Sequence, residues 1–375
     1  MVNVCKKIGV LAFSSCTNYG GMLQVYALQE MLVRMGYIPT VLDLWPIPNN
    51  KYLYGALHNP YVGWVTRFKA FKKALFNRRF RWYERRYIAF QQWQKAFLKM
   101  STQVWRTAAE FANNPPDVDL LEVGSDQVFN KNVASLFLCA DVSESLPRIS
   151  YGASFGSMEK DEKELQRLKE GLAKFKGVAA REKVGAKLVE SLLGDNVPWV
   201  VDPTLLIGRT FWKNWAKRYQ TDWKGGVVYW LGDVKPLRER IEVLRAKYNK
   251  PIKLFLAHYD ARLPLDMEGV DIQWDASPTE FVTAIAQADY VVSNSFHAMM
   301  FSILFGKRAA FMVGGERIAS ATRFTDIAMI ARCEAALYLT WPTAGLELFD
   351  LTPCYDACHQ MILDSRKVLK QLCEV

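Results

Sequence analysis

No apolar run in this sequence reaches the roughly 18 residues that a membrane-spanning helix needs. The seven cysteines are odd in number and scattered, and Cys354, Cys358 and His359 have neither zinc-finger nor redox spacing. Residues 1–7 lack the pattern of a signal peptide and lead into a short apolar segment at residues 8–13. We therefore expect a cytoplasmic protein with reduced thiols.

Internal repeats, low-complexity tracts and a complete G-x-G-x-x-G dinucleotide motif are also missing. Of the 375 residues, 50% are hydrophobic and 23% are charged, which is typical of a soluble globular protein. A chain of this length favours two domains, each large enough to bury its own core.

Acidic residues are nearly absent between residues 67 and 99, where eleven Lys or Arg accompany a single acid, Glu84. The rest of the chain has 37 basic and 37 acidic residues, so this segment carries the whole net charge of +10. Its aromatic residues recur at alternating spacings of four and three, which predicts one long helix with an aromatic seam. The seam is Phe76, Phe80, Tyr83, Tyr87, Phe90, Gln94 and Phe97, and it leaves Arg78, Arg79, Arg81, Arg85 and Arg86 largely on the other face.

Three interpretations of this basic aromatic segment are open from the sequence. In the first, the seam packs on the protein core and the arginines are solvated. In the second, the helix lies on an anionic membrane surface, which explains the aromatic and the basic residues together. The third is nucleic-acid binding, although no recognised DNA- or RNA-binding module surrounds the segment.

The N-terminal pattern predicts a strand at residues 8–13, a helix at 22–35 and a strand at 38–44. The loop before the helix ends in Gly20 and Gly21, which let the backbone approach a ligand closely. Free amides at a helix N-terminus favour an anion, so this loop is a candidate phosphate cradle; a plain tight turn gives the same pattern.

Polar residues follow further apolar runs in the first half. Asp126 comes after residues 119–123, where it would either accept a proton from a hydroxyl or cap the following turn. Arg181 follows the run at residues 177–180. Asp202 precedes a proline, which favours a structural turn over a catalytic role.

His297 stands between a predicted strand at residues 290–292 and a helix-compatible run at 298–305. In open parallel sheets ligands bind beyond the carboxyl ends of the strands, so a titratable ring at this junction suits chemistry. The alternative is a buried, hydrogen-bonded histidine with a packing role.

The alternation of strands and helices predicts an α/β protein of two Rossmann-like, doubly wound domains that face each other across a cleft. We expect the first at residues 1–207, with a helical insertion at about 64–99, and an interdomain connection at 208–225. The second is expected at 226–353, followed by a helix at 354–375 that packs back toward the first domain.

Several stretches, in order from about residue 8 to residue 330, together resemble the polysaccharide pyruvyl transferase family. They are Asn18-Tyr19-Gly20-Gly21 with Leu23-Gln24 and Ala27-Leu28-Gln29, Gly124 to Asn130, Ser150 to Gly156, Arg181-Glu182, Asp202 to Leu206, and Ser293 to His297 with Phe301-Ser302.

This resemblance implies a GT-B-like fold and transfer of the enolpyruvyl group of phosphoenolpyruvate onto two hydroxyls of a sugar. The product would be a cyclic pyruvate ketal, made during capsule or exopolysaccharide assembly. In the family, an Arg-x-His pattern at the end of a late strand helps to bind the donor, and its histidine acts in the reaction. This chain has Ser295-Phe296-His297, so the arginine is absent and Arg181, Arg323 or Lys307 would have to replace its charge.

Under this resemblance His297 and Asp126 are the expected catalytic residues. The donor contacts would be Arg181, Arg323, Ser295, Asn294 and Lys307. The acceptor or phosphate cleft would contain Asn18, Tyr19, Gly20, Gly21, Gln24, Ser125, Gln127, Ser154 and Phe155. No phosphate-metal motif is evident, so we expect no required metal or other cofactor besides the donor substrate.

Two alternatives come from other functional classes. One is a glycosyltransferase that uses a nucleotide sugar in the same two-domain cleft. The other is a non-enzymatic membrane or nucleic-acid-binding module led by residues 67–99. If the protein is a pyruvyl transferase, as the resemblance implies, its partners are phosphoenolpyruvate and a sugar acceptor. That acceptor could be lipid-linked at the inner face of the cell membrane, where the basic helix would dock.

Overall fold

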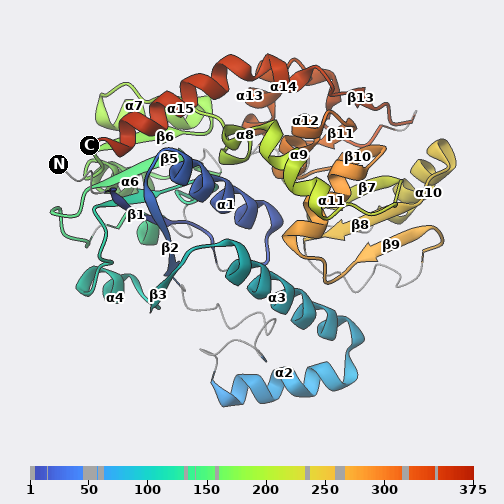
Figure 1. Ribbon diagram of the computed structural model, residues 1–375, viewed down its shortest axis with the longest axis horizontal. Coiled ribbons are helices and arrows are strands. Elements are labelled where there is room, and N and C mark those ends of the chain that lie inside the picture. Colours follow the sequence, from blue (N-terminus) through green and yellow to red (C-terminus); the bar gives the residue numbers. More distant parts are fainter. Residues whose placement is uncertain are drawn as a thin grey trace.

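The computed structural model describes residues 5–14, 16–44, 57, 63–130, 134–139, 141–156, 160–232, 237–257, 267–314, 321–342 and 345–375. Two lobes lie side by side, and each is built on its own mainly parallel β-sheet with helices on both faces (Figure 1).

The first sheet has the order β3-β2-β1-β4-β5-β6, and all its strand pairs are parallel. Strands β4 and β5 are buried along their whole length, as expected for a parallel sheet covered on both faces. The strands are β1 (Lys7–Leu11), β2 (Ile38–Leu44), β3 (Met100–Trp105), β4 (Leu120–Val123), β5 (Arg148–Ala153) and β6 (Gly177–Ala180).

The second sheet has the order β12-β11-β10-β7-β8-β9, with β13 antiparallel to β11. Read from its other edge, this is the same doubly wound order as in the first lobe, so the predicted α/β fold class is confirmed. The strands are β7 (Gly226–Trp230), β8 (Ile252–Leu256), β9 (Val270–Gln273), β10 (Tyr290–Ser293), β11 (Arg308–Met312), β12 (Leu337–Tyr338) and β13 (Phe349–Asp350).

Helices cover both sheets and fill the junction between the lobes. None of the described helices combines the length and apolarity that crossing a bilayer requires. Apart from the basic segment they are α1 (Tyr19–Arg34), α4 (Ala108–Asn113), α5 (Ala134–Phe137), α6 (Glu162–Leu172), α7 (Lys183–Leu193), α8 (Pro203–Ile207), α9 (Arg209–Arg218), α10 (Leu237–Tyr248), α11 (Pro278–Gln287), α12 (Phe296–Phe305), α13 (Thr322–Ala331), the 3₁₀ turn η2 (Glu334–Ala336), α14 (Cys354–Ala357) and α15 (His359–Cys373).

The last helix, α15, crosses back over the first lobe (Figure 1). The amide of Val201 donates to the Ser365 hydroxyl at 3.0 Å, and Lys6 Nζ donates to the carbonyl of Cys373 at 3.0 Å. The two ends of the chain are thereby joined on one lobe.

The basic segment forms two helices, α2 (Trp64–Phe76) and α3 (Arg78–Phe97), so the prediction of one long helix is wrong. The break falls at Asn77, whose side chain accepts a hydrogen bond from the amide of Phe80 at 3.1 Å. Asparagine favours this arrangement because its short side chain competes with the helical backbone.

The aromatic seam on α3 packs inward. Phe80, Tyr87 and Phe90 are buried, which confirms the core-packing interpretation for α3, whereas Phe76 at the end of α2 is 90% exposed. Arg86 is also buried, so its expected place on the solvated face is wrong. Its guanidinium donates to the carbonyls of Thr17 in the first lobe and Leu256 in the second, because loops from both lobes converge on it.

Helix α3 therefore bridges the two lobes. Trp82 stacks on Trp274 of the second lobe with ring centroids 4.6 Å apart, and Trp93 donates to the hydroxyl of Thr279 at 3.0 Å. In the first lobe, Gln94 donates to the carbonyl of Ser14 at 2.7 Å. These contacts fix the loop that leads from β1 into α1.

Candidate active site

A cavity of about 380 Å³ lies between the lobes, at the carboxyl ends of strands from both sheets. The first lobe contributes Asn18, Asp126 and Gln127 to its wall, and the second lobe contributes Ser295, His297 and Arg323. Residues that are far apart in the sequence thus meet at one site.

The local sequence places His297 at the start of α12. The Ser295 side chain caps the helix by accepting a hydrogen bond from the amide of Ala298. Asn294 fixes the preceding turn to the neighbouring strand, since its amide group exchanges hydrogen bonds with both the N–H and the C=O of Leu231 at 2.8 and 2.7 Å. His297 then follows within the first turn of α12 and is 6% exposed.

Gly20 lies directly against the imidazole. A Cβ built on Gly20 would lie 2.0 Å from His297 Nδ1, a distance that real atoms do not adopt. The backbone does make a close approach here, as the paired glycines predicted, but its neighbour is a side chain of the same protein. The amides of Gly20 and Gly21 both donate to the Asn18 side chain, so the expected phosphate cradle is occupied by the helix cap.

Four polar side chains, two of them in the cavity wall, form a continuous series of contacts. His297 Nε2 lies 3.4 Å from Asp202 Oδ2, which is an ion-pair distance for a protonated imidazole and long for a hydrogen bond. Arg181 donates to Asp202 at 2.7 Å and to Asp126 at 3.2 Å. The arginine thus connects the carboxylate next to the imidazole with the carboxylate in the cavity.

The carboxylates of Asp202 and Asp126 are both held in the ionised form. Burial alone would raise the pKa of Asp202, but His297, Arg181 and the Thr204 hydroxyl hold it well below its usual value. Burial likewise opposes ionisation of Asp126, and the charges of Arg181, His297 and Arg323 together lower its pKa. Asp126 is consequently a weak base, better suited to accept a hydrogen bond from a hydroxyl than to remove its proton.

Asp126 also has an unusual backbone conformation, with φ at +69°. Aspartate tolerates this left-handed region better than most residues, because its short side chain bonds locally. Its carbonyl accepts hydrogen bonds from the amides of Val128 and Ser154, both at 2.8 Å. This pinned turn aims the carboxylate at Arg181 and at the cavity.

Arg323, near the start of α13, brings a cationic side chain to the cavity wall. It is 8% exposed, and its guanidinium carbon lies 5.5 Å from the ring centroid of Phe296. Arg181 contacts the same ring at 4.8 Å but does not line the cavity, and its side chain is only 1% exposed. Of the three suggested replacements for the absent arginine, Arg323 is the one that lines this cavity.

Lys307 lies at the opposite end of α12 from His297. Its ammonium donates to the carbonyls of Ala286 and Ala288, at the C-terminal end of α11. Burial lowers its pKa to about 8. The structure therefore gives Lys307 a helix-capping role and no contact with the cavity.

Several other predicted cleft residues lie beneath the wall. Tyr19 donates to the carbonyl of Ala276 at 3.0 Å, which links the lobes. Ser125 donates to the carbonyl of Gly152, and the hydroxyl of Ser154 donates to the carboxylate of Glu182. Gln24 and Phe155 are fully buried. These side chains build the site without facing it.

Sequence reasoning missed Asp202, which it assigned to a structural turn. Asp202 does cap α8, with its side chain accepting from the amide and hydroxyl of Thr204 at 2.9 and 2.7 Å. Its other oxygen accepts from Arg181 and faces His297. The sequence did contain a signal for Asp202, because this residue follows an apolar run just as Asp126 and Arg181 do.

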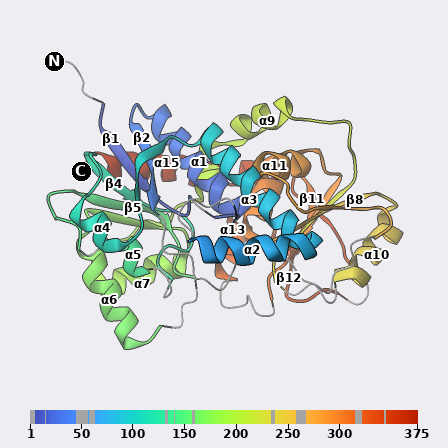
Figure 2. The same ribbon diagram turned by 90° about the horizontal axis from the view of Figure 1, so that it is seen from below.

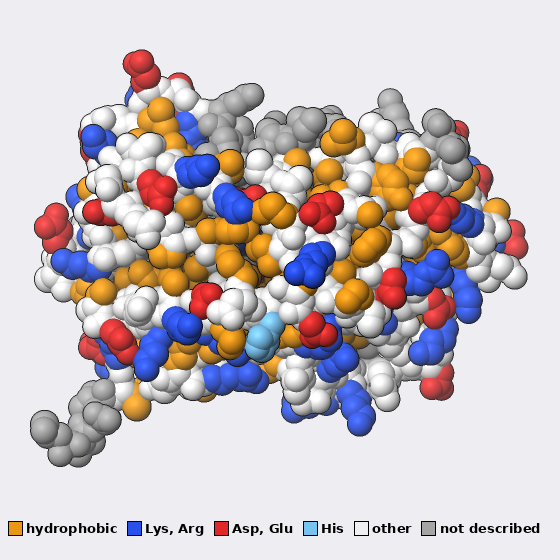
Figure 3. Space-filling view, turned by 90° about the horizontal axis from the view of Figure 1, so that it is seen from above, with side chains coloured by type: hydrophobic (Ala, Val, Ile, Leu, Met, Phe, Trp, Pro, Cys, Tyr) orange, Lys and Arg blue, Asp and Glu red, His pale blue; other side chains and the backbone are white. Residues whose placement is uncertain are grey.

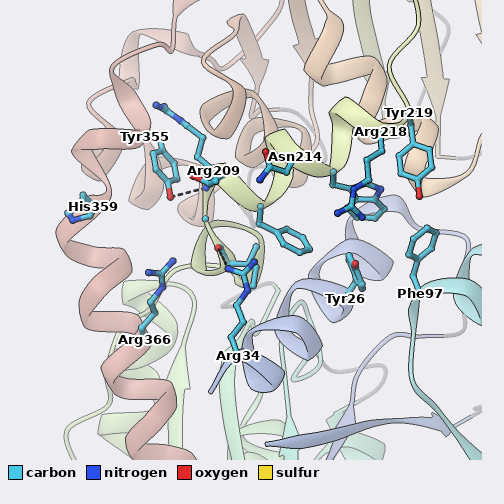
Figure 4. A pocket seen from close by; sticks show the side chains of 15 residues that line it. Tyr26, Arg34, Phe97, Arg209, Asn214, Arg218, Tyr219, Tyr355, His359 and Arg366 are labelled. Atoms are coloured by element: carbon cyan, nitrogen blue, oxygen red, sulfur yellow. Dashed lines mark hydrogen bonds between the residues drawn. The ribbon is translucent and has the colours of Figure 1, made fainter. Parts of the chain in front are cut away.

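A second cavity of about 610 Å³ lies on the face formed by α9 and α15 (Figures 3 and 4). Its wall contains four arginines, but three of them donate to backbone carbonyls at helix ends: Arg34 to Ile207, Arg366 to Leu206 and Arg209 to Leu304. These three arginines are engaged with helix ends, and none of the predicted site residues lies here.

Within the described ranges, no group of three or more His, Cys, Asp or Glu side chains is arranged to hold a metal ion. Cys16 lines the first cavity, and burial raises the pKa of its thiol to about 11. It is therefore a neutral thiol at physiological pH.

The two facing Rossmann-like lobes, with a charged cavity at their strand ends, define a protein of GT-B architecture. A family model, described as "Polysaccharide pyruvyl transferase", matches residues 18–314, well over half of the chain. The chain belongs to the polysaccharide pyruvyl transferase family, as its motifs indicated.

Two solved structures of similar fold contain UDP. UDP-GlcNAc 2-epimerase of Methanocaldococcus jannaschii, in complex with UDP-GlcNAc and UDP, has a TM-score of 0.53 and 10% identity, covering 98% of this chain and 99% of that one. The S. aureus MnaA–UDP structure has a TM-score of 0.52 and 11% identity, covering 96% and 89%. At such identities the likeness shows the fold alone. No curated protein matches the chain.

Proposed function

We propose that this protein transfers the enolpyruvyl group of phosphoenolpyruvate to two hydroxyls of a sugar, which yields a cyclic pyruvate ketal in capsule or exopolysaccharide assembly. The observation that carries the proposal is the meeting of His297, Asp126 and Arg323 in one cavity between the lobes. This set supplies a proton donor, a hydroxyl acceptor and a cation for an anionic donor.

The donor carries a phosphate and a carboxylate, and Arg323 would bind one of these groups with two parallel hydrogen bonds. Arg181, whose two carboxylate partners are already in place, would position Asp126 and Asp202. Ser295 stands where the family has an arginine, and its hydroxyl is engaged as the cap of α12.

The reaction begins with proton delivery from His297 to the methylene carbon of phosphoenolpyruvate, which places positive charge on the neighbouring carbon. A sugar hydroxyl, held by Asp126, attacks that carbon. The carbon–oxygen bond to phosphate then breaks, and a second hydroxyl closes the ring. Of the two hydroxyl protons, one restores His297 and the other leaves with inorganic phosphate.

Asp202 would act as a positioning residue for this chemistry. Its carboxylate lies 3.4 Å from Nε2 and helps to fix the orientation of the ring. Gly20 restricts the position of the ring from its other side, because the space there holds the ring but no added carbon. We propose further that no metal is required, so activity should survive treatment with a chelator.

The first test is binding, which needs no knowledge of the acceptor. Phosphoenolpyruvate should raise the melting temperature of the protein, and calorimetry should show at least about tenfold weaker binding to Arg323→Gln. Arg218→Gln, an exposed arginine of the second cavity, is the matched control and should bind like the wild type.

A nucleotide-sugar glycosyltransferase is the second candidate, favoured by the fold that the chain shares with UDP-binding enzymes. UDP in place of phosphoenolpyruvate distinguishes the two. Stabilisation by UDP alone would support the glycosyltransferase, and stabilisation by neither would favour a non-enzymatic role.

A further inference from the structure

Helix α2 exposes a line of large apolar side chains to solvent. Trp64 is 80% exposed, and Phe68, Phe71 and Leu75 are 53%, 51% and 54% exposed. Their spacing of four, three and four residues places them in one stripe along the helix. Ala70 is fully buried on the inner side, so α2 is anchored to the protein by one face and presents the stripe with another.

Basic residues flank this stripe. Between residues 63 and 83 the sequence has seven Lys or Arg and no Asp or Glu. Lys69 and Lys72 are exposed. At about 100° per residue Lys72 lies about 70° to one side of the stripe and Arg67 about 70° to the other, whereas Lys69 lies further round the helix, about 130° from the stripe. Lysine stems of this kind can follow apolar surface while their ammonium groups reach a polar layer.

We propose that α2 docks the protein on an anionic lipid bilayer, with the stripe inserted at the boundary between headgroups and acyl chains and the lysines on the headgroups. The charge pattern favours lipid over a second copy of this chain, because pairing two α2 faces would bring two strongly basic helices together. The docking surface lies on α2, because the aromatic seam of α3 is buried against the rest of the protein.

The position of α2 fits this role. It lies on the outside of the molecule across the region where the two lobes meet, as two perpendicular views show (Figures 1 and 2). Helix α3 connects it to the site, since Arg86 of α3 donates to the carbonyl of Thr17, which lines the cavity. A docked protein would hold its cavity close to a lipid-linked substrate.

Co-sedimentation of the full chain with vesicles tests the docking. We expect binding to vesicles of phosphatidylglycerol and phosphatidylcholine at low salt, and weaker binding at high salt or to phosphatidylcholine alone. Lys69→Gln/Lys72→Gln should weaken binding by about twenty-fivefold, at about fivefold for each charge. Phe68→Ser/Phe71→Ser should weaken it by at least about tenfold.

Matched controls use exposed residues elsewhere. Lys163→Gln/Lys169→Gln on α6 removes two exposed charges, and Met329→Ser/Leu339→Ser removes two exposed apolar side chains; both should bind like the wild type. A wild-type protein that stays in the supernatant would overturn the proposal, as would equal losses in the α2 and control variants.

If the wild type formed a dimer that did not bind vesicles, and Phe68→Ser/Phe71→Ser made this dimer dissociate, the stripe would be an interface with a second copy of the chain. The assay measures no turnover, so docking and pyruvyl transfer can fail separately.

Discussion

The contact between Gly20 and His297 gives a prediction that depends on a single atom. In Gly20→Ala the new Cβ would lie 2.0 Å from Nδ1, where ordinary contacts start at 3.4 Å, so the ring or the helix must move by about 1.4 Å. Overpacking of this kind costs about 1 to 3 kcal/mol, and alanine returns up to about 1 kcal/mol because it favours the helix. We expect a net loss of stability of up to about 2 kcal/mol.

Removing the imidazole should reverse the sign of this effect. In a His297→Ala background the obstructing ring is gone, so Gly20→Ala should stabilise the protein by about 0.5 to 1 kcal/mol. Urea unfolding of the four proteins in this double-mutant cycle should therefore give a coupling energy of about 1 to 3 kcal/mol. Equal destabilisation in both backgrounds would refute the contact.

Gly21→Ala is the matched control, because its nearest neighbour is the flexible Cys16 thiol at 3.3 Å. It should leave stability and turnover close to those of the wild type. Turnover should fall about a hundredfold in Gly20→Ala, since a displacement of about 1 Å can cost this much. Wild-type turnover in Gly20→Ala would show that the ring position does not matter.

Four further predictions follow from the same geometry. His297→Ala should keep the fold and lower turnover by about a hundred- to ten-thousandfold, measured as phosphate release from phosphoenolpyruvate; near-normal release would return it to a packing role. Asp126→Asn should weaken acceptor use more than donor binding, and unchanged acceptor kinetics would remove it from the site. Asp202→Asn should lower turnover without weakening phosphoenolpyruvate binding, because Asp202 lies 3.4 Å from His297 Nε2 and helps to hold the ring in place; unchanged turnover would contradict this role. The pKa of the buried Glu122 is raised to about 8 by burial, so stability should fall as pH rises from about 4.5 to about 8, and Glu122→Gln should flatten this dependence in urea unfolding.

Much of the fold was predictable because strand and helix periods are local. The alternation around β10 and α12 sufficed to place His297 beyond a strand end, and the same logic placed Asp126 at another strand end. Arg323 was named only as a replacement for the arginine that the family has. The family followed from motifs whose order, rather than any one of them, was specific.

The rest depends on contacts between distant residues, which no local pattern encodes. Arg181 has the same local signature as a ligand-binding arginine, yet it is neutralised by two carboxylates, one of them 55 residues away in the sequence. Arg86 belongs to a charged segment whose sequence predicts exposure to solvent, but its guanidinium binds carbonyls of both lobes. The corner at Asn77 was hidden because the aromatic period continues through it.

The most direct test of the account is the reaction itself in heavy water, with phosphoenolpyruvate and a panel of free and lipid-linked sugars. If an acid in the cavity protonates the methylene carbon, proton NMR should show a ketal methyl group that carries one deuterium, formed with an equal amount of phosphate. His297→Ala should form this product at least about a hundredfold more slowly. A panel that yields neither a deuterated ketal nor phosphate would contradict the account.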